Sequence, residues 1–523
     1  MTGGIIQLVA YGQEDMFINR NPQITFFKTV YRRHTNFSIE QIPQFFDGTN
    51  FSFGQKLSAT IAENGDLMSN AIIVITLPKI KQFSDSLTKF AWVRRIGFSI
   101  IKSIEIQIDG RLIDKHYGDW LNIWAELTGG LSGPHSRGFH NMIGDIDELT
   151  SFTSYKNEYT LYVPLQFWFC RASGLAIPLV ALKYSDVKIN IELNDASKCY
   201  MISPSHYISC NADLVNFLPF EYIQQNINGV IGAGLFSSYD IINKRLYYYK
   251  ITTNKLTGIP ASTQVANDPI ASNLLYLNSS SQKYLIIGNT SKFQILPTIN
   301  ATSKIYGYSK IRDLNITSCH LLVDYIFLDS DERTKFLQSK HDYLIEQLYY
   351  TPPITIENLN RSIQITVGQP CKLLAWVTNM QYIYTSGDHF NYTDSYIRKY
   401  NNTEYPDFLV GQAVGNNIIT NETILLNGLQ RINMSSSSYF NWVQSYQHLD
   451  CNVPNGLNIY SFGLHPQIIQ PTGSCNMSQI DDVKIQMQLS YAVNINLPAS
   501  FRAYALCYNV FRVSNGLAGL VFT

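Results

Sequence analysis

One short stretch groups cationic side chains in a chain that carries little charge elsewhere. Tyr31, Arg32, Arg33 and His34 lie between two aromatic clusters in NPQITFFKTVYRRHTNFSIE, residues 21–40. A guanidinium group pairs with carboxylates and phosphates and also stacks on aromatic rings. The stretch therefore suits three tasks: binding an anionic substrate in an enzyme, contacting nucleic-acid phosphates, or docking a neighbouring protein.

Sequence motifs for catalysis are absent. The chain has no GxSxG nucleophile elbow, no HExxH zinc motif and no phosphate-binding loop. Residues 229–234, GVIGAG, lack the order and context of a dinucleotide fingerprint, so we expect a flexible loop. Residues 144–148, GDIDE, gather carboxylates without the glycine and distal glutamate of an EF-hand, which predicts a solvated loop.

Two further groups of polar residues are better explained by structural roles than by catalysis or metal binding. His341, Asp342 and Glu346 stand where a helix is expected to pass into a strand, and we expect them to interact with the helix end rather than to transfer protons. Cys319 and His320 have no second pair at metal-binding spacing, which favours a packed strand. We therefore expect a protein that is not an enzyme and has no cofactor or metal site.

The charge balance argues against a nucleic-acid binder. Lys plus Arg and Asp plus Glu each number 39, and charged residues make up only 15% of the chain. Arg94 and Arg95 beside Trp92 repeat the pairing of arginine with aromatics, but a neutral chain does not neutralise phosphates. Arginine is also enriched in protein interfaces, so we expect docking to protein and no direct binding of nucleic acid.

The spacing of the cysteines and the first ten residues bear on the cellular compartment in which the protein folds. The eight cysteines are widely separated and form no CxxC pair, which predicts reduced and mostly buried thiols. The first ten residues have no basic leader, and Gln7 interrupts their apolar run, so we expect neither a signal peptide nor a membrane span. Folding in the cytosol is the expectation.

The composition and local patterns predict strands. Aromatic residues make up 13% of a 523-residue chain, which is long enough for two or more domains. Residues 71–77, AIIVITL, are continuously apolar, as in a strand covered on both faces. Residues 104–110, IEIQIDG, alternate into an Asp-Gly turn, which predicts a hairpin.

Two segments share one pattern and indicate a duplication. Residues 185–193, SDVKINIEL, and residues 481–489, DDVKIQMQL, have apolar side chains at the same alternate positions and a lysine at the same step. A strand at Ala503–Val513 follows the second segment closely, whereas its expected counterpart, Leu321–Asp329, lies more than a hundred residues beyond the first. We therefore predict a large, partly stranded loop insertion at about 194–318.

Few helices are expected. Asp119 is a candidate N-cap for residues 120–127, and Asp329 with Glu332 has capping-box spacing for a helix at Ser330–Gln338. This second helix would lead into a strand at Tyr343–Tyr350. Two antiparallel β units joined by a helical linker suggest paired sandwiches or jelly rolls.

Long blocks in both halves resemble the major capsid proteins of nucleocytoplasmic large DNA viruses, the family of phycodnaviruses, iridoviruses and mimivirus-like viruses. The blocks are GGIIQLVAYGQEDMFINRNPQITFFKTVYRRHTNFSIE, WVRRIGFSIIKSIEIQIDGRLIDKHYGDWLNIWAELT, VPLQFWFCRASGLAIPLVALKYSDVKINIEL, VDYIFLDSDERTKF, HDYLIEQL, SYFNWVQSYQHLDCNVPNGLNIYSFGLHPQIIQPTGSCNMSQID and NVFRVSNGLAGLVFT. The chain departs from the family at residues 368–377, GQPCKLLAWV, where an Asn-His-Pro-Val-Lys-Glu-like run is usual.

The resemblance implies an all-β double jelly roll, that is, two tandem eight-stranded antiparallel β-sandwiches with few short helices and long loops. The implied divisions are an N-terminal arm at 1–30, a first roll at 31–335 with the insertion at about 194–318, and a second roll at 336–523. The implied function is that of a major capsid protein, which forms homotrimers of pseudo-hexagonal outline and tiles the icosahedral shell of a large DNA virus.

The same resemblance implies partners and a location. The partners are further copies of the chain, neighbouring capsomers, minor capsid proteins and an internal membrane. The location is the outer shell of the virion, with synthesis and assembly in the host cytoplasm. Candidate assembly contacts are Tyr31, Arg32, Arg33 and His34, and candidate glycan acceptors in Asn-x-Ser/Thr sequons are Asn278, Asn289, Asn300, Asn391 and Asn401.

Two alternatives stay open from the sequence. A minor double-jelly-roll paralogue would occupy special positions of the shell. A glycan-binding attachment protein would use Tyr- and Asn-rich loops, such as those of the insertion, to bind sugars.

Overall fold

A computed structural model describes most of the chain. The described residues are 3–10, 20–29, 31–48, 50–83, 88–212, 215–218, 220–227, 230–240, 243–250, 285–298, 304–305, 314–396, 398–400, 403–405 and 412–522.

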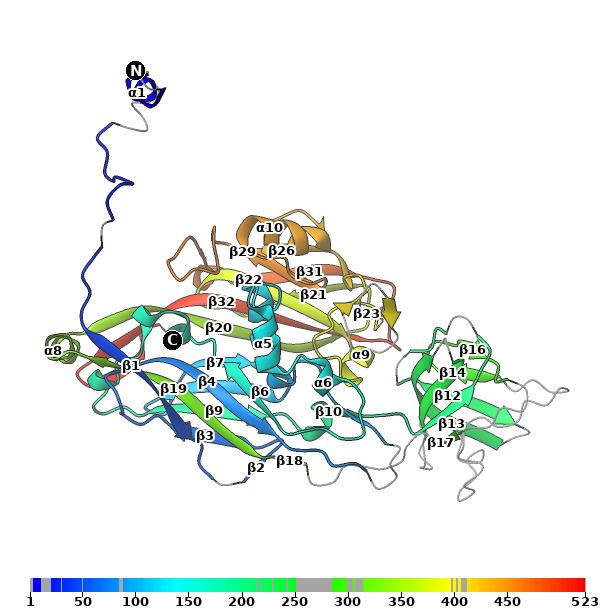
Figure 1. The fold of residues 1–523 in the computed structure, drawn as a ribbon. Coiled ribbons are helices and arrows are strands. Elements are labelled where there is room, and N and C mark those ends of the chain that lie inside the picture. Colours follow the sequence, from blue (N-terminus) through cyan, green and yellow to red (C-terminus); the bar gives the residue numbers. More distant parts are fainter. Residues whose placement is uncertain are drawn as a thin grey trace.

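Two four-stranded antiparallel sheets form the first β-sandwich (Figure 1). Their orders are β1-β19-β4-β8 and β3-β9-β6-β7. The strands are β1 (Phe37–Phe45), β3 (Lys56–Thr60), β4 (Leu67–Leu77), β6 (Ile101–Ile108), β7 (Arg111–Tyr117), β8 (Tyr159–Pro164), β9 (Val187–Leu193) and β19 (Ser318–Leu328). In β9 every second side chain is buried between the sheets, as the alternating pattern predicted.

A second sandwich repeats this arrangement. Its sheets contain the orders β20-β32-β22-β29 and β21-β31-β26-β27, with β30, β33 and β28 paired alongside β22, β32 and β26. The strands are β20 (His341–Ile356), β21 (Asn360–Gln364), β22 (Pro370–Met380), β26 (Ile419–Leu426), β27 (Leu429–Gln430), β28 (Ser435–Ser436), β29 (Leu457–Ser461), β30 (Cys475–Asn476), β31 (Val483–Leu489), β32 (Ala499–Ser514) and β33 (Leu517–Leu520).

The two sandwiches have one topology. If the eight shared strands of each are numbered in chain order, both have sheets of order 1-8-3-6 and 2-7-4-5. Eight strands in two such sheets form a jelly roll, so the predicted fold class is confirmed. Strands β9 and β31, whose sequences suggested the duplication, are both the seventh strand, and β19 and β32 are both the eighth.

Local sequence signals account for several elements. Asp109 (φ 52°) and Gly110 (φ 71°) form the turn between β6 and β7, because a tight hairpin turn requires positive φ at both central residues. Helix α8 (Ser330–Gln338) begins where predicted, with the Asp329 side chain accepting a hydrogen bond from the Glu332 amide at 2.9 Å. It joins the first roll to β20, which is longer at both ends than the predicted strand.

The segment between β9 and β19 contains a β subdomain with its own core. Its main sheet has the order β16-β15-β12-β13-β14-β11-β17, and its core includes Ile208, Phe217 and Tyr248. Residues 230–234 belong to β13, so the flexible loop predicted there is wrong. The strands from this segment are β10 (Tyr200–Ile202), β11 (His206–Ser209), β12 (Tyr222–Ile227), β13 (Val230–Asp240), β14 (Arg245–Lys250), β15 (Ile286–Gly288), β16 (Gln294–Ile295), β17 (Lys304–Ile305) and β18 (Asn315–Ile316).

The remaining elements are short and lie in connections. Strand β10 pairs with β5 and β18 pairs with β2, while β23, β24 and β25 form a small sheet in the connection between β22 and β26. These strands are β2 (Phe51–Ser52), β5 (Phe90–Trp92), β23 (Arg398–Tyr400), β24 (Thr403–Tyr405) and β25 (Gln412–Ala413). The helices are α1 (Gly3–Val9), α3 (Ile96–Ser99), α4 (Gly118–Leu127), α5 (Ser136–Ile143), α6 (Asp147–Thr150), α7 (Trp168–Arg171), η1 (Ser173–Leu175), η2 (Leu179–Ala181), η3 (Ala196–Lys198), α9 (Gln381–Thr385), η5 (Tyr439–Val443), α10 (Gln444–His448) and η6 (Met477–Gln479).

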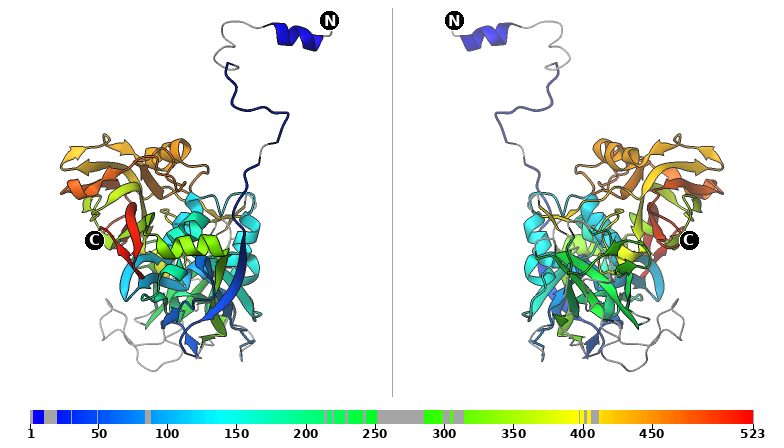
Figure 2. Two further views of the ribbon diagram at one scale, coloured as in Figure 1. Left: turned by 90° about the vertical axis from the view of Figure 1, so that its left-hand side faces the viewer. Right: turned by 90° about the vertical axis from the view of Figure 1, so that its right-hand side faces the viewer.

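The N-terminal segment and the insertion lie at opposite ends of the first roll. Strand β1 is antiparallel to β19, with Phe37 opposite Leu328 and Phe45 opposite His320. The chain enters β1 at one end, and the insertion leads into β19 at the other end. Figures 1 and 2 show the N-terminal segment extending away from the sandwiches, with α1 far from both rolls, and Figure 1 shows the insertion at the opposite end.

Candidate assembly surfaces

Helix α4 of the first roll packs against the second roll. Trp120, Ile123, Trp124 and Leu127 project from one side of this helix and are at most 5% exposed. They share an apolar cluster with side chains of the β20-β32-β22-β29 sheet, namely Leu348, Leu373, Ala375, Val377, Leu457, Ile459, Tyr504 and Leu506. Burial of two tryptophans and several aliphatic side chains makes this a strong contact between the two rolls.

Asp119 connects the rolls through polar contacts. The sequence predicted an N-cap, but α4 begins one residue earlier, at Gly118, so Tyr117 is at the N-cap position and Asp119 lies in the first turn. Its carboxylate instead accepts hydrogen bonds from Tyr392 (3.2 Å) and Tyr504 (3.1 Å) and pairs with Arg502 at 2.5 Å. The N-cap prediction is therefore wrong, because the helix starts before Asp119 and the carboxylate binds Arg502 of the second roll.

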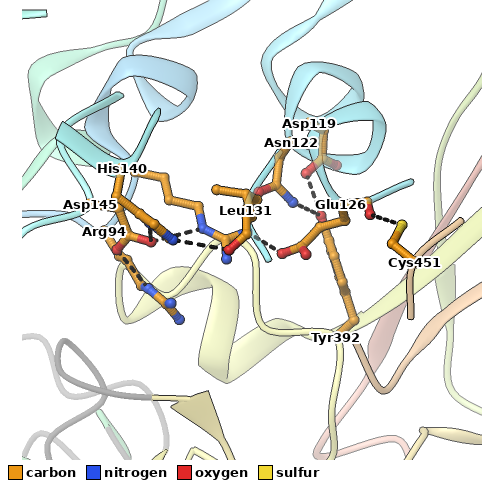
Figure 3. A network of polar contacts seen from close by, with 10 residues as sticks. Arg94, Asp119, Asn122, Glu126, Leu131, His140, Asp145, Tyr392 and Cys451 are labelled. Atoms are coloured by element: carbon orange, nitrogen blue, oxygen red, sulfur yellow. Dashed lines mark hydrogen bonds and ion pairs between the residues drawn. The ribbon is translucent and has the colours of Figure 1, made fainter. Parts of the chain in front are cut away.

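A polar network holds α4 on the first roll (Figure 3). Asp145 pairs with Arg94 at 2.8 Å and with Arg95 at 3.2 Å, and Arg95 also pairs with Glu126 at 2.7 Å. His140 lies 3.0 Å from the same Asp145 carboxylate. The solvated loop predicted around Asp145 is therefore wrong, and Arg94 and Arg95 are bound within the chain rather than available for docking.

Charges in this network compensate each other. Burial alone would raise the pKa of Asp145, but Arg94, the hydrogen bond from His140 and Arg95 hold that pKa well below its ordinary value. Figure 3 shows that the network continues from Asn122, whose Nδ2 donates to the Tyr392 hydroxyl at 3.1 Å, into the second roll. The thiol of Cys451 in the second roll approaches the Leu127 carbonyl oxygen at 3.1 Å.

A buried ion triad forms another contact between the rolls. Glu346 on β20 pairs with Lys372 on β22 and with Arg171 of the first roll, and their side chains are at most 9% exposed. The Arg171 guanidinium also lies over the Trp124 ring, with its carbon 3.9 Å from the centroid. Glu346 therefore acts in the contact between the rolls, and the prediction that it interacts with a helix end is wrong. His341 does contact the α8 end, at the Phe336 carbonyl (2.8 Å).

The described residues offer little for catalysis. Within those ranges no three His, Cys, Asp or Glu side chains are grouped to hold a metal ion. A cleft of about 360 Å³ between the rolls is lined by Asp119, Glu192 and Arg502, each of which is already ion-paired inside the chain. In the described part, moreover, no helix is both long and apolar enough to cross a membrane.

The four predicted assembly residues lie together on the extended segment before β1. Tyr31 is 80% exposed, and Arg32, Arg33 and His34 are also exposed. Nearby Phe26 and Phe27 are 89% and 98% exposed. In the described residues 20–29 and 31–36 all charged side chains are basic, so this segment presents positive charge and aromatic surface together.

The glycan candidates fall into three groups. Asn289 is exposed in a turn after β15. Asn391 is 1% exposed, and its Nδ2 donates to Asp388 and to the Ser395 carbonyl, so a glycan on this nitrogen does not fit the fold and we withdraw it. Asn278, Asn300 and Asn401 lie outside the described residues.

Comparisons with known proteins identify the family. Residues 25–228 match the model described as major capsid protein N-terminus, and residues 332–519 match that of the large eukaryotic DNA virus major capsid protein. The chain is 39% identical to "Probable capsid protein 4" of Acanthamoeba polyphaga mimivirus, with 100% of this chain and 99% of the relative covered. It is 30% identical to the major capsid protein of Phaeocystis pouchetii virus, with 100% of both chains covered.

A solved structure extends the likeness to the fold. A chain of the quasi-atomic model of the PBCV-1 virus capsid is 25% identical, with a TM-score of 0.60 over 95% of this chain and 100% of that chain. The chain belongs to the major capsid protein family of large eukaryotic DNA viruses. It is a structural component of the virion capsid that assembles with further copies of itself, and it is not an enzyme.

Proposed function

We propose that three copies of this chain form a capsomer of pseudo-hexagonal outline, which is the tile of an icosahedral shell. The observation that carries this proposal is the repetition of one strand order, 1-8-3-6 and 2-7-4-5, in two rolls that pack against each other through α4. Two similar rolls per chain supply six similar units from three chains. A closed ring of three chains then has six nearly equivalent edges for contacts with neighbouring tiles.

In this proposal the chain divides into an arm at 1–30, a first roll at 31–335 with an insertion at about 194–318, and a second roll at 336–523. The insertion faces outward and the arm faces the interior, because they leave opposite ends of the first roll. Asn289 is a candidate glycan acceptor in the described part of the insertion, because its side chain is exposed.

The arm is the proposed contact with partners beneath the shell. Phe26 and Phe27 of the arm, with the exposed Tyr31, Arg32, Arg33 and His34 that directly follow it, suit a surface that is both acidic and apolar. Neighbouring capsomers, minor capsid proteins and an internal membrane with anionic headgroups are the proposed partners. Assembly in the host cytoplasm agrees with eight cysteines that are all unpaired in the structure.

Electron microscopy of the purified protein tests the capsomer. Class averages are expected to show hexagonal particles with three-fold symmetry, in which alternate corners carry the extra density of the insertion. Particles of two-fold symmetry, or isolated two-lobed particles at every concentration, contradict the proposal.

A second role within the same family is a minor paralogue at special shell positions. The relative named "Probable capsid protein 4" favours this alternative, because its number implies several capsid proteins in one virus. Quantitative mass spectrometry of purified virions separates the two roles. A major subunit is expected to be the most abundant shell protein, whereas a paralogue is expected at a small fraction of that amount.

A further inference from the structure

The outer face of the β1-β19-β4-β8 sheet is largely apolar and is exposed at its two edge strands, β1 and β8. The register places Phe45, His320, Val74 and Tyr162 in one outward row across the four strands. Phe45 is 71% exposed and Tyr162 is 41% exposed, while Val74 between them is 3% exposed. The next outward row is also apolar, and it consists of Pro43, Leu322, Ile72 and Pro164.

Polar side chains border this face and already bind each other. In the third outward row, Asp324 accepts hydrogen bonds from Gln41 at 2.9 Å and from Asn70 at 3.2 Å. The face therefore has an apolar centre beside a satisfied polar rim, which is the usual anatomy of a protein interface.

A second uncovered surface lies on η5 and α10 of the second roll. Trp442 is 63% exposed, Val443 is 38% exposed and Tyr446 is 87% exposed. The intervening Gln444 and Ser445 are at most 3% exposed, because they face their own roll. One side of this helical segment is thus anchored, while its aromatic side projects into solvent. Exposed tryptophan and tyrosine this close together are typical of a docking surface.

The contact of α4 with the second roll shows how a helical aromatic surface packs on a sheet face in this chain. Helix α4 and the η5–α10 segment occupy the same place in the two rolls, between the fifth and sixth strands, β7 and β8 or β27 and β29. Each presents two aromatic side chains four residues apart, Trp120 and Trp124 in α4 and Trp442 and Tyr446 in the second roll. The α4 pair is buried on the 1-8-3-6 sheet of the other roll, whereas the second pair has no such cover.

We propose that Trp442 and Tyr446 of one chain dock on the outer face of the β1-β19-β4-β8 sheet of a second copy. We identify the partner as another copy of this chain. Each molecule exposes both a helical aromatic surface and a sheet face, and it already forms one contact of this kind internally, between α4 and the sheet of the second roll. The two surfaces differ, so the contact between chains is head-to-tail. Three chains then close into a ring in which contacts between the two rolls of one chain alternate with contacts between neighbouring chains. This inference rests on the proposed trimer and assigns the surfaces that form it.

A double variant tests the helical surface. Trp442→Ala with Tyr446→Ala is expected to convert a particle of three chain masses into one of 59.5 kDa, measured by light scattering with size-exclusion chromatography. Both side chains are exposed, so the circular dichroism of the strands is expected to stay unchanged. The matched control, Tyr491→Ala with Ile495→Ala, removes side chains that are 90% and 74% exposed elsewhere on the second roll and is expected to remain trimeric.

A photo-crosslinking amino acid at position 442 tests the partner surface directly. Crosslinked peptides are expected from residues 37–45, 70–76, 159–164 or 318–324 of another chain. Crosslinks to other regions overturn the assignment, as does a double variant that remains trimeric as stably as the wild type. A wild-type protein that is monomeric contradicts the proposed trimer itself, whereas a wild-type trimer that survives the double substitution contradicts only the assigned surfaces.

Discussion

Glu422 makes the stability of the second roll depend on pH. Its side chain on β26 is fully buried between the two sheets, where Trp376 Nε1 donates to Oε2 at 2.7 Å. The other carboxyl oxygen finds no hydrogen-bond partner among the described residues. Burial raises the pKa of Glu422 from 4.5 to about 8, although the hydrogen bond from Trp376 opposes the shift.

The direction of the pH effect follows from the raised pKa. Between the unfolded pKa of 4.5 and the folded pKa of about 8, the unfolded chain loses the Glu422 proton while the folded chain keeps it. The free energy of unfolding therefore falls as pH rises through this window and is highest below it. Each pH unit inside the window costs at most about 1.4 kcal/mol, so the loss from pH 5 to 7.5 is about 3 kcal/mol.

The substitution Glu422→Gln removes the titration and keeps an acceptor for Trp376. We expect the thermal midpoint of the variant to exceed that of the wild type by roughly 6–12 °C at pH 7.5, since about 3 kcal/mol shifts a unit of this size by that amount. The gap is expected to shrink toward pH 5. Scanning calorimetry from pH 5 to 8.5 at one protein concentration measures both midpoints.

A matched control separates burial from simple loss of charge. Glu357 is exposed in the same roll, so Glu357→Gln is expected to leave the midpoint of the wild type nearly unchanged at every pH. Parallel pH curves for the wild type and Glu422→Gln would refute the reasoning, because they would show that Glu422 has the same pKa in the folded and unfolded chains.

Two further predictions concern charged side chains. Glu346→Ala leaves buried Lys372 and Arg171 without their shared anion and is expected to lower the free energy of unfolding by about 3–5 kcal/mol in urea titrations. Asp342→Ala on the same strand breaks an exposed pair and is expected to change it little, so equal effects of the two variants would contradict the account of the triad. Replacing Arg32 and Arg33 together by Ala is expected to keep the β content but weaken trimer or shell formation in sedimentation assays, and unchanged assembly would reject their docking role.

The sequence predicted elements whose cause is local. The alternation in residues 187–193 and 483–489 requires a face buried between sheets, and both segments occupy the same strand position in their rolls. The Asp109–Gly110 turn and the Asp329 cap likewise depend on neighbours within a few residues. The family resemblance supplied the connection of these pieces into a double jelly roll, which local patterns alone left open between sandwiches and jelly rolls.

Contacts between distant segments could not be predicted in this way. Asp119 has the residue type of an N-cap, but it lies in the first turn of α4, and its partners Tyr392 and Arg502 lie hundreds of residues away. The sequence around Asp145 suggests a solvated loop carboxylate, but in the folded chain Asp145 pairs with Arg94 and Arg95. A charged residue beside a run of apolar residues in a strand is a local signal of such sites, and Lys372 in PCKLLAWVTNM carries it, whereas Glu422 in ITNETILL stands among polar neighbours and gives no such signal.

The central claim is that this chain is one third of a closed capsomer. The native mass of the purified protein, measured by light scattering at moderate salt with and without reductant, tests it most directly. The account predicts about three times the chain mass of 59.5 kDa, unaffected by reductant because the eight cysteines are unpaired. A stable monomer across the accessible concentration range, or a particle whose mass depends on oxidation, would contradict it.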